Sequence, residues 1–98
     1  MVVVAKIKVK PGREADAEKA FRKEIDHVTR EEPGTELYLM HRARKDPTTF
    51  LFYERYADGA AFDRHGKSAA MRELFATLQP MLDGAPAIEI YEEIAGKK

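Results

Sequence analysis

The chain has 98 residues, enough for one domain, and its 17 Lys and Arg residues balance 17 Asp and Glu residues. This zero net charge argues against a general attraction to nucleic acids or acidic membranes. The absence of cysteine excludes disulfides, thiolate metal sites and cysteine nucleophiles, and it is typical of a cytoplasmic protein. We expect one domain over residues 1–95 and a loose tail over 96–98, with no membrane span or targeting segment.

The first half of the chain predicts a strand, a long helix and a second strand. Apolar residues alternate with lysines over residues 2–10, which is the period of a strand with one buried face. Apolar residues recur at helical spacing over 13–32, and a Pro-Gly pair follows each of these two segments. Residues 35–44 alternate again and predict the second strand.

A hairpin is predicted next. Residues 45–48 have the composition of its turn, with Pro47 at a turn position. Residues 49–56 then predict a strand rich in aromatic side chains. Both faces of this strand and of the preceding one carry large apolar residues. One face is therefore expected to meet the helices, and the other to meet a second copy in a homodimer.

Two helices and a last strand complete the chain. Asp58 is a good N-cap for a short helix that ends near residue 65, and Ser68 for a longer helix that ends near residue 82. Residues 87–94 predict the fourth strand. The resulting order, β-α-β-β-α-β, is that of the ferredoxin-like α+β fold, with a four-stranded antiparallel sheet and helices on one face.

Four neighbouring segments resemble one known family. They are residues 4–12 (VAKIKVKPG), 31–42 (EEPGTELYLMHR), 50–58 (FLFYERYAD) and 60–65 (AAFDRH). In this order and spacing they resemble the antibiotic biosynthesis monooxygenases, which belong to the dimeric α/β-barrel proteins and include quinol monooxygenases. The resemblance implies a homodimer that forms an α+β barrel. It also implies oxidation of a phenolic, quinol or polycyclic aromatic molecule by O2 without flavin, haem or metal.

His65 and Glu54 are the candidate catalytic residues. His65 falls on the inward side of the short helix, where an imidazole can accept a phenolic proton near neutral pH. The resulting phenolate is electron-rich and reacts with O2 more readily than the phenol. Glu54 lies on an aromatic strand face, where desolvation would make it a possible base. The structural alternatives are a histidine that only forms a hydrogen bond within the dimer, and a carboxylate ion pair at the dimer interface.

A further set of side chains is expected to line the substrate pocket, with core or interface packing as the alternative role of each. These residues are Tyr38, Phe52, Tyr53, Tyr56, Phe62, Met71 and Phe75. His41 is a weaker candidate for the same pocket. His27 lies on the opposite side of its helix from Ile25, so we expect it to face solvent.

No metal or nucleotide motif is visible. The three histidines fall on separate elements, no carboxylates cluster at ligand spacing, and no glycine-rich phosphate loop or nucleophile elbow occurs. Haem degradation is also disfavoured by comparison with the haem-degrading relatives. The chain has no tryptophan, and Ala5 and Phe75 stand where those relatives carry an asparagine and the haem-ligating histidine. We therefore expect no cofactor besides the co-substrate O2.

One departure from the family pattern leaves other functions open. Ala69-Ala70-Met71 stands where many family members carry a second histidine in a Pro-His-Phe stretch. If that histidine takes part in catalysis, this chain lacks it. The first alternative is a non-catalytic module that binds a small hydrophobic ligand. The second is an isomerase or lyase in which His65 and Glu54 act as an acid–base pair.

Overall fold

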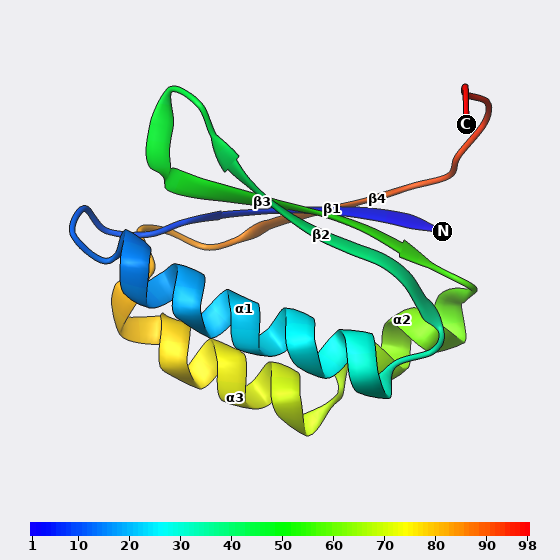
Figure 1. Cartoon of the computed structure of the whole chain (residues 1–98), viewed down its shortest axis with the longest axis horizontal. Coiled ribbons are helices and arrows are strands. Elements are labelled where there is room, and N and C mark those ends of the chain that lie inside the picture. Colours follow the sequence, from blue (N-terminus) through cyan, green and yellow to red (C-terminus); the bar gives the residue numbers. More distant parts are fainter.

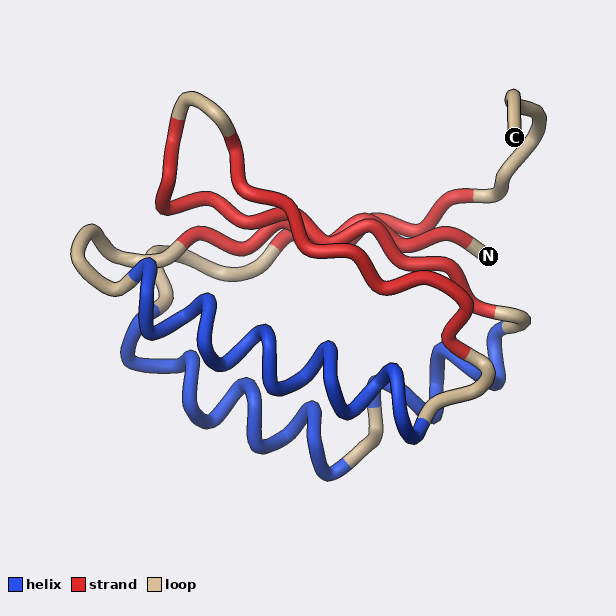
Figure 2. Tube along the Cα trace, viewed as in Figure 1, coloured by secondary structure: helices blue, strands red, loops and turns tan.

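Four antiparallel strands form one sheet in the order β2-β3-β1-β4 in the computed structural model, which describes residues 1–98. The strands are β1 (Val2–Lys8), β2 (Thr35–Ala43), β3 (Asp46–Tyr56) and β4 (Ala87–Tyr91). Three helices cover one face of the sheet, as Figures 1 and 2 show; they are α1 (Glu14–Glu31), α2 (Gly59–Gly66) and α3 (Ala69–Leu78). The ferredoxin-like α+β prediction is confirmed.

Alternation along the strands explains where the core lies. Val3, Ala5 and Ile7 of β1 face the helices and are buried, whereas the lysines between and after them are exposed. The same face of β3 presents Phe50 and Phe52, and Phe21 of α1 packs against both, with ring centroids 5.1 and 5.0 Å apart. These edge-on and tilted contacts join α1 to the middle of the sheet.

The hairpin turn is shorter than the predicted 45–48 and ends three residues earlier. The turn is Arg44-Lys45, and β3 already begins at Asp46. The Asp46 carboxylate accepts hydrogen bonds from the backbone nitrogen and the hydroxyl of Thr48, at 3.0 and 2.6 Å, and so organises the first residues of the strand. Pro47 is tolerated in this strand because it precedes the residues that pair with β1, where its missing N–H would matter.

The C-terminal elements are shorter than predicted. α3 ends at Leu78 instead of near residue 82, and a turn of 3₁₀ helix, η1 (Gln79–Met81), follows it. Pro80 lies in this turn, and its ring is incompatible with a continued α-helix. β4 ends at Tyr91, so the irregular tail covers residues 92–98. No helix combines the length and hydropathy needed to cross a bilayer.

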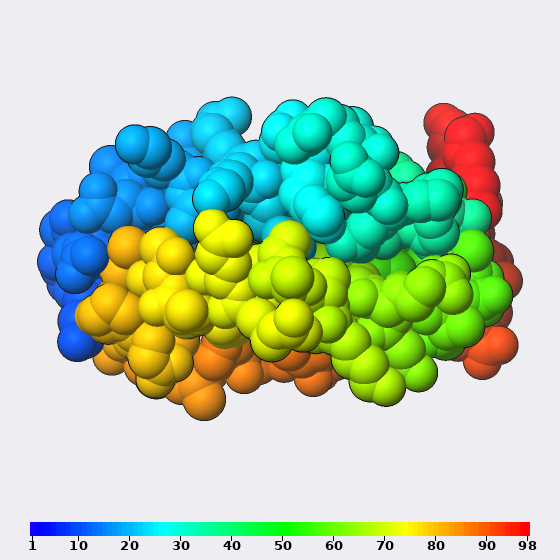
Figure 3. Space-filling view, turned by 90° about the horizontal axis from the view of Figure 1, so that it is seen from below, coloured from blue at the N-terminus to red at the C-terminus, as the bar shows by residue number.

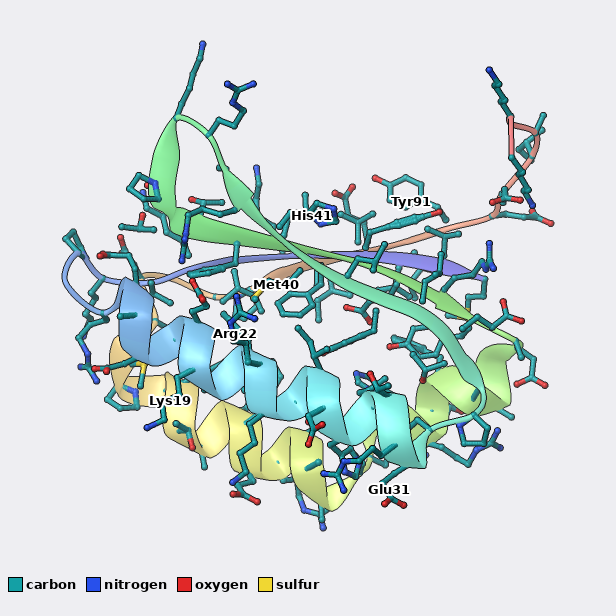
Figure 4. The ribbon with its side chains drawn as sticks, in the orientation of Figure 1. Lys19, Arg22, Glu31, Met40, His41 and Tyr91 are labelled. Carbon is teal, nitrogen blue, oxygen red and sulfur yellow. The ribbon has the colours of Figure 1, made fainter.

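The second face of the sheet carries no helix. Figure 4 shows Met40 between the sheet and the helices, whereas His41 and Tyr91 lie on the opposite side. The uncovered face includes large apolar side chains, with Leu39 and Tyr91 exposed to 47% and 48%. We call this surface the open face.

Candidate functional site

A cavity of about 230 Å³ lies between the sheet and the helices. Its walls are mostly apolar side chains from β1, β3, α2 and α3, and its ionisable members are Tyr38, Glu54 and His65. The helices do not cover the edge strand β4. In Figure 3, which views the helix side, the segment before β4 is visible beside α3. Ile88 lines the cavity there and is 56% exposed, although its pairing with Ala5 places it on the helix side of the sheet. The cavity therefore borders the surface at β4.

Most of the residues predicted from the sequence meet in this cavity. Those that line it are Tyr38, Phe52, Glu54, Phe62, His65, Met71 and Phe75. His41 and Tyr53 do not belong to it, because they lie on the open face, where the His41 ring contacts the carbonyl of Leu51 at 3.2 Å. Tyr56 is a buried residue behind the cavity wall, 1% exposed.

Two capping side chains fix the backbone at the two ends of the short helix that carries His65. Asp58 accepts a hydrogen bond from the backbone nitrogen of Ala61 at 2.8 Å, which confirms the predicted N-cap of α2. Ser68 caps α3 by accepting from the backbone nitrogen of Met71 at 3.1 Å. The Ser68 hydroxyl also donates to the carbonyl oxygen of His65 at 2.8 Å. The backbone of His65 is thus tied to the start of the following helix.

The Pro-Gly pair after α1 allows α2 to lie close to the start of β2. A Cβ atom at Gly34 would stand 2.7 Å from the Cβ of Ala61, which is closer than two carbon atoms can pack. The Gly34 carbonyl also accepts a hydrogen bond from the backbone nitrogen of Ala57 at 2.9 Å. This close approach brings the C-terminal end of α1 next to α2.

Glu32, at the end of α1, is the direct partner of His65. His65 is 3% exposed, and its Nδ1 atom lies 2.8 Å from Oε1 of Glu32. The rings of Tyr38 and Tyr56 flank the imidazole at centroid distances of 5.1 and 5.5 Å. A neutral imidazole that donates its Nδ1 proton to Glu32 keeps a lone pair on Nε2, which is the arrangement of carboxylate–histidine pairs in general-base catalysis.

Glu54 does not pair with His65. Its Oε1 atom accepts a hydrogen bond from the hydroxyl of Tyr56 at 2.5 Å in the buried interior. Burial raises the pKa of Glu54 to about 7; the Tyr56 hydrogen bond opposes this shift, and the charge of Glu32 adds to it. A carboxyl group with this pKa can give or take a proton near neutral pH.

Glu24 is a further buried carboxyl group, on the inner side of α1 and 3% exposed. Burial raises its pKa to about 7, and repulsion by Glu32 and Glu54 contributes. The Oε2 atoms of Glu24 and Glu32 are buried and accept no hydrogen bond. Burial also raises the pKa of Tyr38 well above its ordinary value, so this tyrosine remains a neutral hydrogen-bond donor.

Neither Glu24 nor Glu32 was predicted as a site residue. Glu24 stands three residues after the buried Phe21 and four before the buried Val28, so helical periodicity places it inward. A charged residue within an apolar stripe is the signal that could have revealed it.

His27, expected to face solvent, is only 32% exposed in its side chain, and its Nε2 atom lies 3.5 Å from Oε2 of Glu32.

Comparison with known proteins identifies a family model that matches most of the chain. The family model for antibiotic biosynthesis monooxygenase matches residues 1–77. A Caulobacter crescentus protein classed as a candidate antibiotic biosynthesis monooxygenase is 31% identical, with a TM-score of 0.91 over 96% of this chain and 89% of that chain. Protein SO0527 from Shewanella oneidensis is 30% identical, with a TM-score of 0.83 over 92% of this chain and 86% of that chain.

A further solved structure shows the same fold at lower sequence identity. A Nitrosomonas europaea protein of the same description is 22% identical, with a TM-score of 0.90 over 96% of this chain and 98% of that chain. No curated protein gives a significant match. Because the family model covers well over half of the chain, the protein belongs to the antibiotic biosynthesis monooxygenase family.

Proposed function

We propose that the protein is a cofactor-independent monooxygenase that oxidises a phenolic or quinol molecule with O2 in the cavity beneath the sheet. The observation that supports this proposal most directly is the position of His65. His65 lines an apolar cavity, and its Nδ1 atom lies 2.8 Å from the Glu32 carboxylate. An imidazole oriented in this way is suited to accept a proton from a hydroxyl group bound in the cavity. Family membership supports the reaction class.

In the proposed reaction, Nε2 of His65 accepts the phenolic proton. The electron-rich ring carbon of the phenolate then forms a bond to O2 and supplies the electrons that reduce it to a peroxide. His65 returns its proton to the outer peroxide oxygen. Loss of the proton on the ring carbon and cleavage of the O–O bond release water and leave a quinone. One phenol and one O2 thus give one quinone and one water, and no external reductant is needed.

The size of the cavity favours a small aromatic substrate. An apolar cavity of ~150 Å³ holds benzene, and the cavity here is about 230 Å³. This space suits one or two rings, and a larger polycyclic molecule would extend past Ile88 to the surface at β4. Tyr38 lines the same cavity and can donate a hydrogen bond to a substrate oxygen.

An isomerase or lyase is the second candidate function, and Glu54 is the observation that favours it. Glu54 lines the same cavity as His65, and its pKa of about 7 makes it a second proton-transfer group. Such chemistry needs no oxygen, so product formed under nitrogen would identify it. Saturable binding of quinones without any product would instead identify a ligand-binding module.

We also propose that a second copy of the chain covers the open face. Leu39 and Tyr91 are about half exposed there, and Tyr53 lies between them on the same face. Two-fold pairing of this face with itself would bury these side chains and give each chain the cover that its own helices do not provide.

Oxygen uptake tests the proposed function. A panel of one- and two-ring phenols and quinols is offered to the protein, and the product is analysed by mass spectrometry after reaction with isotopically labelled O2. The proposal predicts one labelled oxygen atom in the quinone. Substrates that bind but consume no oxygen above the blank would contradict it.

A further inference from the structure

We propose that Glu24, Glu32 and His65 form a binding site for a divalent transition-metal ion. These side chains come from three places in the fold: the middle of α1, the residue directly after its end, and α2. One potential ligand atom from each lies within 4.8 Å of the other two. The inference goes beyond the proposed function, whose reaction uses no metal.

Unsatisfied carboxylate oxygens are the first observation that points to a cation. The Oε2 atoms of Glu24 and Glu32 are both buried without a hydrogen-bond partner. No lysine or arginine forms an ion pair with either residue. Glu24 is 97% buried, since only 3% of its surface is exposed. The Glu24 carboxylate has therefore lost its hydration without a counter-charge, and a bound cation would supply that charge.

The donor set indicates the kind of ion. Two carboxylates and an imidazole suit borderline metals such as Zn²⁺, whereas Mg²⁺ prefers oxygen ligands and retains several waters. His27 offers a further donor at the edge of the set, because its Nε2 atom lies 3.5 Å from Oε2 of Glu32. A zinc ion held by Glu24, Glu32 and His65 could therefore complete a four-coordinate shell with His27 or with water.

A hollow on the surface leads an ion to two of the three proposed ligands, Glu32 and His65. It has a volume of about 260 Å³, and His27, Glu32 and His65 are among its lining residues. Glu31 lines the same hollow but is exposed, and Figure 4 shows it at the end of α1 on the side away from the sheet. Glu31 is therefore a matched control, because it is also a glutamate and lines the same hollow as Glu32 but lies outside the proposed ligand set.

The metal site and the proposed proton transfer make different demands on His65. The Nδ1 atom is the nitrogen that faces Glu32, so it is the nitrogen available to the ion. An ion on Nδ1 leaves the imidazole proton on Nε2, where it blocks acceptance of a phenolic proton. Binding is therefore measured without substrate, and a failure to bind metal would leave the proposed function untouched.

Calorimetric titration with zinc chloride tests the inference on protein first stripped with a chelator. The wild-type chain is expected to bind one ion. The Glu24→Gln variant keeps the size of the side chain and is expected to bind zinc at least about 10-fold more weakly. Even residues that only hydrogen-bond to a metal ligand contribute about 10–100-fold to metal affinity. The Glu31→Gln variant is expected to bind like the wild type. Circular dichroism confirms that each variant is folded.

X-ray absorption on the zinc-loaded wild type tests the site without any substitution. The inference predicts only nitrogen and oxygen neighbours at ~2.0–2.2 Å, including an imidazole. Four outcomes would overturn it. They are no zinc binding by the wild type, a zinc affinity of Glu24→Gln equal to that of the wild type, a loss of zinc affinity in Glu31→Gln equal to that in Glu24→Gln, or a zinc coordination shell without imidazole.

Discussion

The Nδ1 atom of His65 lies 2.8 Å from Oε1 of Glu32, a residue 33 positions earlier in the chain. The pair is nearly removed from solvent, with 3% and 14% of the two side chains exposed. Glu32 immediately precedes the Pro-Gly pair that lets α2 approach the start of β2. The same short segment thus ends a helix, allows close packing and supplies the partner of the candidate base.

Glu32→Gln is expected to impair turnover more than substrate binding. The substitution removes the charge that orients His65, whereas Glu32 itself does not line the cavity. In a comparable carboxylate–histidine pair, loss of the carboxylate lowers kcat by up to ~10⁴-fold, and we expect a fall of at least about 10-fold here with little change in KM. Steady-state oxygen uptake measures both constants. Unchanged kcat, with Glu31→Gln as the control, would exclude an orienting role for Glu32.

Gly34→Ala is expected to destabilise the protein through α2. The added methyl group would meet Ala61 at 2.7 Å, so α2 must move or the strand must shift. Overpacking of this kind lowers the free energy of unfolding by about 1–3 kcal/mol. Gly66→Ala is the control, because a Cβ there meets nothing within 4 Å. Thermal unfolding compares the two variants, and equal stability would show that the close approach of β2 and α2 has no energetic weight.

Stability is expected to fall with rising pH through the titration of Glu54. Its folded-state pKa of about 7 lies above its ordinary value of 4.5, so the folded chain binds more protons between these values. The cost of ionising Glu54 is absent below pH 4.5 and is fully present above about pH 7. Glu54→Gln should therefore raise the free energy of unfolding at about pH 8 by on the order of 1–3 kcal/mol and leave it nearly unchanged at about pH 4.

Urea unfolding of the wild type and of Glu54→Gln at both pH values measures this difference. Repulsion by Glu54 contributes to the raised pKa of Glu24, so the difference between the two proteins reports the Glu54 charge together with its effect on Glu24. If the stability of the variant relative to the wild type were no higher at about pH 8 than at about pH 4, a raised pKa for Glu54 would be contradicted.

Leu39→Lys is expected to dissociate the proposed homodimer. Leu39 is 47% exposed on the open face, where a lysine would be buried without a partner in the dimer. Sedimentation equilibrium should give twice the chain mass of 11.1 kDa for the wild type and a single chain mass for the variant. Ala76→Lys, at an exposed position on α3, should remain dimeric. A wild type that is monomeric at micromolar concentration would refute the dimer.

The order of elements could be predicted from the sequence because each local signal agrees with the fold. The lysine alternation of β1, the caps at Asp58 and Ser68, and the Pro-Gly pairs all act over a few residues. The hairpin turn could not be placed by composition alone. Asp46 and Pro47 are typical turn residues, but in this chain the Asp46 side chain organises the start of a strand.

The site was only partly predictable, for two physical reasons. Both faces of β2 and β3 are apolar, so alternation could not say whether Tyr38 or His41 would point into the cavity. The partner of His65 is set by how the end of α1 packs against α2, which is a long-range contact without a local pattern. Glu24 was detectable as a charge within an apolar helical stripe, but its closeness to Glu32 and His65 required the structure.

Oxygen uptake by the wild type, His65→Ala and His41→Ala decides whether His65 is the base of the proposed reaction. His41 is the matched control, because it is a histidine on the open face, outside the cavity. We predict that a phenol or quinol accepted by the wild type is oxidised at a similar rate by His41→Ala and not measurably by His65→Ala, with both variants folded. Undiminished uptake by His65→Ala would refute the proposed proton transfer and make His65 a structural residue.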